Sequence, residues 1–135
     1  MPTILPDPIL QTARVELRIL PDEFTVCQIT DSRDICFEEE FVFVGKTDDE
    51  LSLVCRTTVV PTGIIVRDDG WRTIKIQGVL DFSLCGILAG IASILADARI
   101  SIFAVSTYNT DYILLKKENL KAAERVLHEN GYSFN

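Results

Sequence analysis

Two segments of the chain share one hydrophobic pattern, and this internal similarity restricts the possible folds more than any other feature of the sequence. FVFVGKTDDELSLVC, residues 41–55, aligns with IFAVSTYNTDYILLK, residues 102–116, at an offset of 61 residues. In each segment an apolar run precedes a polar turn and a second apolar run follows, which predicts a β-hairpin. FTVCQI, residues 24–29, aligns with WRTIKI, residues 71–76, at an offset of 47, so each copy also has a strand before its hairpin.

The two offsets differ by 14 residues, and the second copy uses these extra residues for a predicted helix over Ser83–Ala96. The corresponding segment of the first copy, TDSRDICFEEE, has room only for a short turn or a broken helix. Asp81 or Ser83 can cap the predicted helix by accepting a hydrogen bond from a free backbone N–H. Its apolar residues recur at helical spacing: Leu84, Ile87, Leu88, Ile91, Ile94 and Leu95.

A second helix is predicted after the second hairpin, in ENLKAAERVLHENG, with Asn119 as its cap and Gly131 at its end. In the first copy, Pro61 and Gly63 exclude a regular helix at this place. Three further strands are predicted, at Ala13–Leu20, Ile64–Arg67 and Tyr132–Phe134.

The second copy therefore has the order β-α-β-β-α-β, the split βαβ arrangement in which helices cover one face of an antiparallel sheet. The predicted class is α+β, with ferredoxin-like units in tandem. We place a pared-down first unit at residues 13–67 and a complete second unit at residues 68–135.

Composition and motifs exclude several classes of function. A formal net charge of −7 and a pI near 4.6 argue against nucleic-acid binding, which needs clustered Lys and Arg. No cysteine pair has CxxC spacing and His128 is the only histidine, so no metal site is expected. No nucleophile, acid–base or phosphate-loop motif is present, which predicts a protein without catalytic activity or cofactor. No stretch is long and apolar enough for a membrane span, and no signal peptide is recognised, so a cytoplasmic protein is expected.

The stretch from Gly78 to Tyr132 resembles the ACT domain, a small-molecule-sensing module of many amino-acid biosynthetic enzymes. ADARISIFAVST followed by TDYILL carries this resemblance most specifically. With its opening LRILPDEFTVCQI, the whole chain resembles stand-alone bacterial proteins of two ACT-like units, whose second unit is similar to the ACT domains of aspartate kinases and of a cytosolic arginine sensor. The resemblance implies a regulatory or sensing module that binds an amino acid between units, in contact with Gly78–Gly86 and Ser101–Asp111.

An amino-acid ligand presents a carboxylate and an ammonium group together. The start of the first helix suits the carboxylate, because its N–H groups are free and its dipole is positive there. Asp81 and Asp111 are candidate partners of the ammonium group or of a basic ligand side chain. The expected ligand-binding residues are Asp81, Phe82, Ser83, Leu84, Gly86, Ser106, Thr107, Thr110 and Asp111.

Each of these residues has a second, structural interpretation. Asp81 can serve only as a helix cap, and Asp111 and Asn109 can make only local turn bonds to the backbone. Gly86 and Gly90 can serve only to let the helix approach the sheet closely.

The strand before the second polar turn is apolar on both faces, with Phe103 and Val105 on one of them. Helices cover only one face, so a partner unit or subunit is expected on the other. We therefore expect a non-catalytic amino-acid sensor, a homodimer that regulates an enzyme. The alternative is a dimerisation or docking module that regulates a partner enzyme without any ligand.

Overall fold

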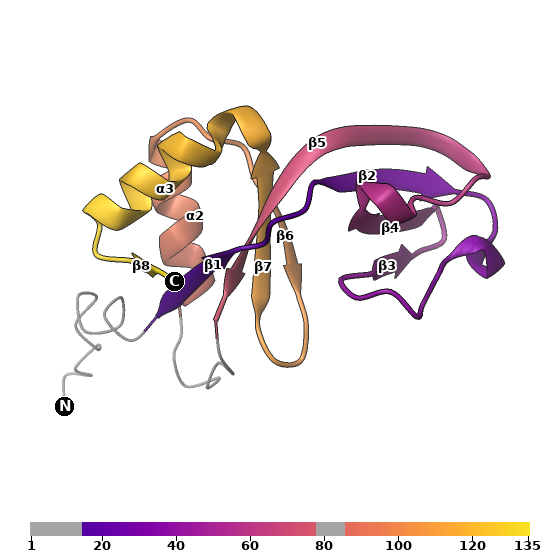
Figure 1. Cartoon of the computed structure of the whole chain (residues 1–135), viewed down its shortest axis with the longest axis horizontal. Coiled ribbons are helices and arrows are strands. Elements are labelled where there is room, and N and C mark those ends of the chain that lie inside the picture. The colour runs from indigo at the N-terminus through magenta and orange to yellow at the C-terminus, as the bar shows by residue number, and fades with distance from the viewer. Residues whose placement is uncertain (1–14, 78–85) are drawn as a thin grey trace.

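One long strand, β5 (Ile64–Ile76), runs through the whole molecule and joins its two halves into a single sheet (Figure 1). The computed structural model describes residues 15–77 and 86–135. In these residues eight strands form one sheet. The N-terminal half consists of β2 (Phe24–Ile29), β3 (Phe43–Lys46), β4 (Leu51–Arg56) and the first part of β5. The C-terminal half contains the rest of β5 with β1 (Glu16–Ile19), β6 (Phe103–Ser106), β7 (Asp111–Lys116) and β8 (Ser133–Phe134).

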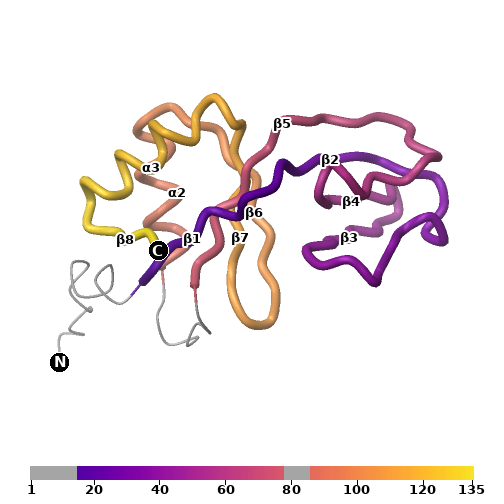
Figure 2. The backbone as a smooth tube through the Cα atoms, viewed as in Figure 1, coloured from indigo at the N-terminus to yellow at the C-terminus, as the bar shows by residue number. Residues whose placement is uncertain are grey.

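The predicted short strand at Ile64–Arg67 and the predicted strand at residues 71–76 are thus one element. A bulge opposite Thr25 keeps it continuous, because Phe24 pairs with Trp71 whereas Val26 pairs with Asp68. Gly70 lies in this bulge with a φ of 84°, a left-handed conformation that glycine adopts without a steric cost. The bulge bends β5, and Figure 2 shows the strand arching from one half to the other.

The N-terminal half has its own small core. Cys27, Ile29, Leu53 and Cys55 share one face of β2 and β4, and Ile35 covers them from the short 3-10 turn η1 (Ser32–Asp34). The turn confirms that the first copy has no room for a full first helix. A second 3-10 turn, η2 (Thr57–Val59), follows β4.

In the C-terminal half the strands lie in the order β8-β1-β5-β7-β6. β1 pairs antiparallel with β5 and parallel with β8. Its alternating pattern was expected from the sequence, but its position between β5 and β8 was not. Leu17 of β1 is fully buried in the main core, which accounts for the alternation.

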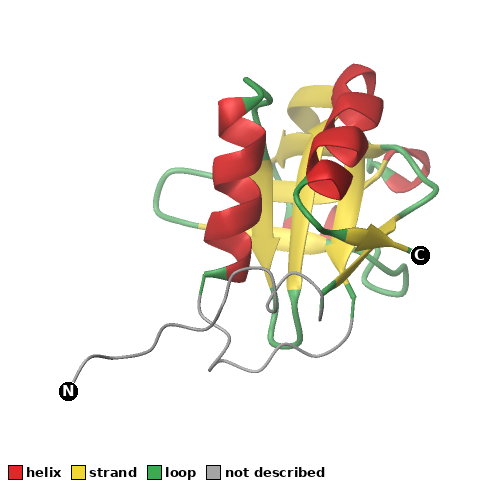
Figure 3. Cartoon of the chain, turned by 90° about the vertical axis from the view of Figure 1, so that its left-hand side faces the viewer, coloured by secondary structure: helices red, strands yellow, loops and turns green. Residues whose placement is uncertain are grey.

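Two helices, α2 (Ile87–Asp97) and α3 (Leu120–Glu129), cover one face of this half (Figure 3). The helix predicted over Ser83–Ala96 thus begins only at Ile87, with Gly86 rather than Asp81 or Ser83 as its N-cap. Asn119 is the N-cap residue of α3, as predicted. Asn119 makes no side-chain cap bond, because it closes the 3-10 turn η3 (Lys117–Asn119) that leads directly into the helix. The prediction for Gly131 is confirmed, since it follows α3 with a φ of 95°.

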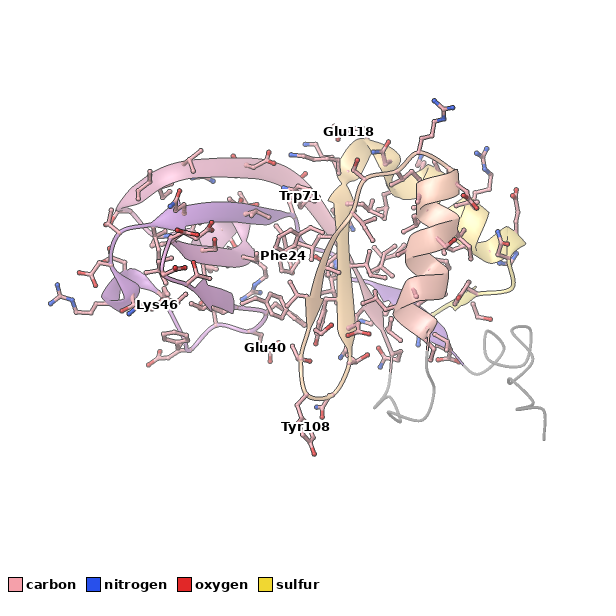
Figure 4. All side chains as sticks on the ribbon, turned by 180° about the vertical axis from the view of Figure 1, so that it is seen from behind. Phe24, Glu40, Lys46, Trp71, Tyr108 and Glu118 are labelled. Carbon is pink, nitrogen blue, oxygen red and sulfur yellow. The ribbon has the colours of Figure 1, made fainter. Side chains whose placement is uncertain are left out.

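The N-terminal half covers part of the opposite face of this half, at β7 and Val105. The cover expected over residues 100–105 is therefore incomplete, because Phe103 stays 37% exposed. Leu114 of β7 shares a buried cluster with Phe24 and Val54. Phe41 and Phe43 contact Tyr112, with ring centroids 6.1 and 5.1 Å apart. The labelled Phe24 and Trp71 lie where the halves meet (Figure 4).

The two hairpins have the same construction. β3 and β6 each have four residues, β4 and β7 each have six, and a four-residue turn joins them in both cases. The N–H of Thr47 donates to the Glu50 carbonyl at 2.9 Å, and Thr107 bonds to Thr110 at the same distance. The elements correspond at an offset of 60 residues, one fewer than the sequence alignment gave.

Candidate functional site

The turn between β6 and β7 is the part of the predicted site that the structure describes best. Ser106 and Asp111 face each other as the last pair of the hairpin. Between them, Thr107 closes the turn in two ways. Its backbone N–H and its hydroxyl both donate to the Thr110 carbonyl, at 2.9 and 3.0 Å. The Thr107 hydroxyl also accepts from the Thr110 N–H at 3.4 Å.

Thr110 fixes this turn to the end of β5. Its side chain is 4% exposed, and its hydroxyl donates to the Ile76 carbonyl at 2.6 Å. A buried hydrogen bond of this kind is costly to break, because the carbonyl would keep its desolvation without a donor. The position of the turn relative to the end of β5 is therefore well defined.

The Asp111 side chain makes no local turn bond to the described backbone, which was its alternative interpretation. The two threonines supply the turn bonds, and in residues 15–77 and 86–135 neither the Asp111 carboxylate nor the Ser106 hydroxyl has a hydrogen-bond partner. Asn109 likewise makes no side-chain bond within these ranges. Tyr108, at the tip, is 87% exposed and points away from the sheet (Figure 4). The turn thus presents a carboxylate, a hydroxyl and an exposed ring.

Helix α2 begins at the same end of the sheet as this turn, as Figures 1 and 3 show. Gly86 occupies its N-cap position with a φ of 83° and no side-chain cap. A Cβ atom added there would meet no atom of the described residues within 4 Å, so the positive φ, and not close packing against them, explains this glycine. Gly90 is different, because an added Cβ would lie 3.4 Å from the Tyr132 hydroxyl, which supports the packing interpretation.

Gln77 is a polar residue at this end of the sheet that sequence analysis missed. Its backbone N–H donates to the Glu16 carbonyl at 2.8 Å, while its side-chain oxygen is buried and has no partner among the described residues. The pairing of Lys75 with Tyr112 places Gln77 opposite Thr110 when the register is extended. A polar residue directly after the last apolar position of a predicted strand was the available signal.

The remaining predicted residues, Asp81, Phe82, Ser83 and Leu84, lie outside the described residues. Of the nine predicted positions the structure brings four together in one turn, namely Ser106, Thr107, Thr110 and Asp111, and it places Gly86 at the same end of the sheet.

The ionisation of the neighbouring aromatic residues is set by burial. Burial raises the pKa of Tyr112, the residue after Asp111, and it also raises the pKa of Tyr132 beside Gly90. Both hydroxyls are therefore neutral at physiological pH.

Within the described ranges, no three His, Cys, Asp or Glu side chains are grouped in a way that could hold a metal ion. No described helix is long and apolar enough to cross a membrane.

Comparison with known proteins identifies similar sequences for both halves. The family model of the ACT domain matches residues 66–129, and a separate model of an N-terminal domain matches residues 22–63. Over 58 residues the chain is 41% identical to the human cytosolic arginine sensor for mTORC1 subunit 1. This match covers 42% of the chain and 18% of the sensor, so the chain spans less than a fifth of the length of that relative.

Solved structures match over almost the whole chain. Protein Atu0741 from Agobacterium tumefaciens is 32% identical, with a TM-score of 0.79, and the match covers 90% of this chain and 92% of that one. The ligand-free regulatory subunit of aspartate kinase from Thermus thermophilus has a TM-score of 0.60 at 13% identity, with 88% of this chain and 98% of that chain covered. This second likeness concerns the fold alone.

Proposed function

The chain belongs to the ACT domain family, and on this basis we propose that it is a non-catalytic regulatory protein that binds a free amino acid at the β6–β7 turn. The proteins similar to it include a cytosolic arginine sensor and, in fold, the regulatory subunit of an aspartate kinase. The α+β fold of these regulatory domains is shared by this chain.

The observation that carries the proposal is the division of roles within the turn. Thr107 and Thr110 hold the backbone, which leaves the Asp111 carboxylate and the Ser106 hydroxyl available. The Asp111 carboxylate suits the ligand's ammonium group. Gln77, whose buried side-chain oxygen has no partner among the described residues, lies beside this turn, opposite Thr110. Leu84 and Gly86, at the start of the first helix, are proposed to donate backbone N–H groups to the ligand's carboxylate. Asp81 is proposed as a second partner of the ammonium group, and Phe82 and Ser83 as further residues of the same site.

We further propose that the site lies between two copies of the chain. β6 is an edge strand that pairs only with β7 among the described strands, and no residue from Ile100 to Thr110 is charged. Two copies of an acidic chain repel each other at most of their surface. Pairing the two β6 edges about a two-fold axis would bring only uncharged residues of this segment face to face. Phe103, which is 37% exposed, would be covered by such an arrangement.

We also propose that the chain consists of two ACT-like units in tandem. The matching construction of the two hairpins supports a tandem repeat of ACT-like units, with the predicted boundary between residues 67 and 68 falling within β5. The acidic charge supports a protein that does not bind nucleic acid, and a cytoplasmic location fits a sensor of free amino acids.

A thermal-shift screen of the twenty amino acids tests the proposal. A ligand that binds only the folded protein stabilises it by about 2.7 kcal/mol at one hundred times Kd, which corresponds to roughly 9 °C for a chain of this length. Asp111→Asn should remove most of this shift. Asp97→Asn is the matched control, because Asp97 is exposed at the end of α2 and makes no described ion pair. Equal shifts for both variants would show that Asp111 does not contact the ligand.

The alternative, a module that docks on an enzyme without a ligand, is favoured by the same uncharged edge of β6. The two functions give different results. A sensor responds to one amino acid or a few chemically similar ones, whereas a docking module shows no shift with any of the twenty and still forms dimers in sedimentation experiments.

A further inference from the structure

β3 forms the outer edge of the N-terminal half, and one side of this strand is open among the described strands. β3 pairs only with β4 within the described part of the chain. The Thr47 N–H donates to Glu50 across the hairpin. Because the backbone groups of successive strand residues face opposite edges, the N–H and C=O groups of Val44 and Lys46 face the open edge. This edge can accept another strand.

The charge of the protein is concentrated around this edge. Residues 34–55 contain seven carboxylates and a single lysine, so this segment carries almost all of the net charge of −7. Glu38 and Glu40 precede β3, and Asp48 and Asp49 follow it, all of them exposed. None of these four carboxylates forms an ion pair with a described residue. β3 is therefore bracketed by unneutralised negative charge.

An exposed aromatic ring lies in the loop that precedes β3, and several contacts hold this loop in place. Phe37 is 69% exposed, although the loop around it is anchored. Before it, Ile35 is buried, and after it Phe41 packs against Phe24 with a left-handed φ of 59°. Within the loop, the Glu39 carboxylate accepts from Arg56 at 2.5 Å. An anchored loop loses little conformational freedom on binding, so an exposed ring on it suits a protein contact.

We propose that the open edge of β3 binds an extended, basic segment of a partner protein, which adds to the sheet as a further strand. The partner's main chain pairs with Val44 and Lys46, and its Lys or Arg side chains contact the acidic residues at the two ends of β3. A second copy of this chain does not fit, because a two-fold axis would bring the acidic segments face to face. This surface is separate from the proposed amino-acid site, and the inference does not depend on it.

The test uses the labelled peptide Lys-Val-Lys-Val-Lys-Val and fluorescence anisotropy with the full-length protein. The peptide should bind, more weakly as salt is added, and Glu38→Lys/Glu40→Lys should weaken binding by about tenfold. The matched control is Glu118→Lys/Glu129→Lys, which changes the net charge equally at exposed positions of the C-terminal half. Figure 4 shows that Glu118 lies near α3, whereas Glu40 and Lys46 belong to the other half. The control should bind as the wild type does, within about twofold.

A backbone variant separates strand addition from charge attraction alone. Val44→Pro removes an N–H group that β4 does not use, and proline is tolerated at such positions of an edge strand. It should therefore leave the urea midpoint nearly unchanged and weaken peptide binding. The proposal is wrong if the peptide does not bind, if both charge-reversal variants weaken binding equally, or if Val44→Pro binds like the wild type. In the first case, the carboxylates serve only to protect the edge from pairing.

Discussion

Thr110 and Thr73 are both buried, and the structure predicts opposite effects for the same substitution at the two positions. The Thr110 hydroxyl donates to the Ile76 carbonyl at 2.6 Å. The Thr73 hydroxyl, on β5, has no hydrogen-bond partner in the part of the chain that the structure describes, although the residue is 0% exposed. Valine keeps nearly the shape of threonine and replaces the hydroxyl with a methyl group, so each variant measures the effect of exchanging one hydroxyl for an apolar group.

Thr110→Val should lower the free energy of unfolding by about 1–2 kcal/mol, because the bond is lost and a buried carbonyl loses its donor. Thr73→Val should leave stability unchanged or raise it by up to about 1 kcal/mol, since a desolvated hydroxyl is removed. Urea unfolding followed by the fluorescence of Trp71, the only tryptophan, measures both. With a slope of about 1.5 kcal/mol/M, the two midpoints should differ by roughly 1 M. Equal losses in both variants would refute the reasoning.

Three further predictions concern the N-terminal half and its junction with the rest. Hydrogen bonds from Thr25 and Arg67 lower the pKa of Asp69, so this carboxylate stabilises the protein above its ordinary pKa of 3.8 and less as pH falls below it. The advantage of the wild type over Thr25→Val in urea should therefore shrink on acidification, and a constant difference would contradict this. Burial raises the pKa of Cys55 to about 11, so mass spectrometry should show iodoacetamide modifying the exposed Cys36 far faster at pH 8. Gly70→Ala should cost about 1–2 kcal/mol in thermal unfolding because of its positive φ, and an unchanged melting temperature would exclude strain there.

The helices and the hairpin of the C-terminal half follow from the spacing of apolar residues in the sequence. Apolar residues at helical spacing predicted α2 and α3, and runs of apolar residues around a polar turn predicted β6 and β7. These signals are local, and each element buries the face that its pattern indicates. The start of the first helix was predicted wrongly, because α2 begins at Ile87 with Gly86 as its N-cap and not with a cap at Asp81 or Ser83. Asn119 takes the predicted N-cap position of α3 but makes no side-chain bond, because the turn η3 leads directly into the helix.

The sequence did not predict which strands pair with one another in the sheet. The alternation around Leu17 predicted a strand but not its neighbours, since a period of two specifies a face and not a partner. β1 therefore could not be placed between β5 and β8. Likewise, separate strands were predicted at Ile64–Arg67 and at residues 71–76, whereas a bulge lets β5 continue from one to the other.

For the candidate site, the sequence predicted the residues of the turn better than their roles. Asn and Asp are the usual residues for local bonds in turns, so Asn109 and Asp111 had that alternative. In the structure, Thr107 makes these bonds and Thr110 bonds to the distant Ile76. The partner of Thr110 is 34 residues away in sequence, and no local pattern indicates it. Gln77 was missed although a local signal was present, namely a polar residue directly after the last apolar position of a predicted strand.

The most direct test of the proposed amino-acid site is an NMR titration of the labelled protein with the amino acid that gives the largest thermal shift. The account predicts that the amide signals of Ser106, Asp111, Gln77 and Gly86 change most, and that Asp111→Asn abolishes these changes. If no amino acid at about 10 mM, ten times a millimolar Kd, shifts either the melting temperature or these signals, the account is contradicted. The same holds if the changes lie elsewhere in the sheet.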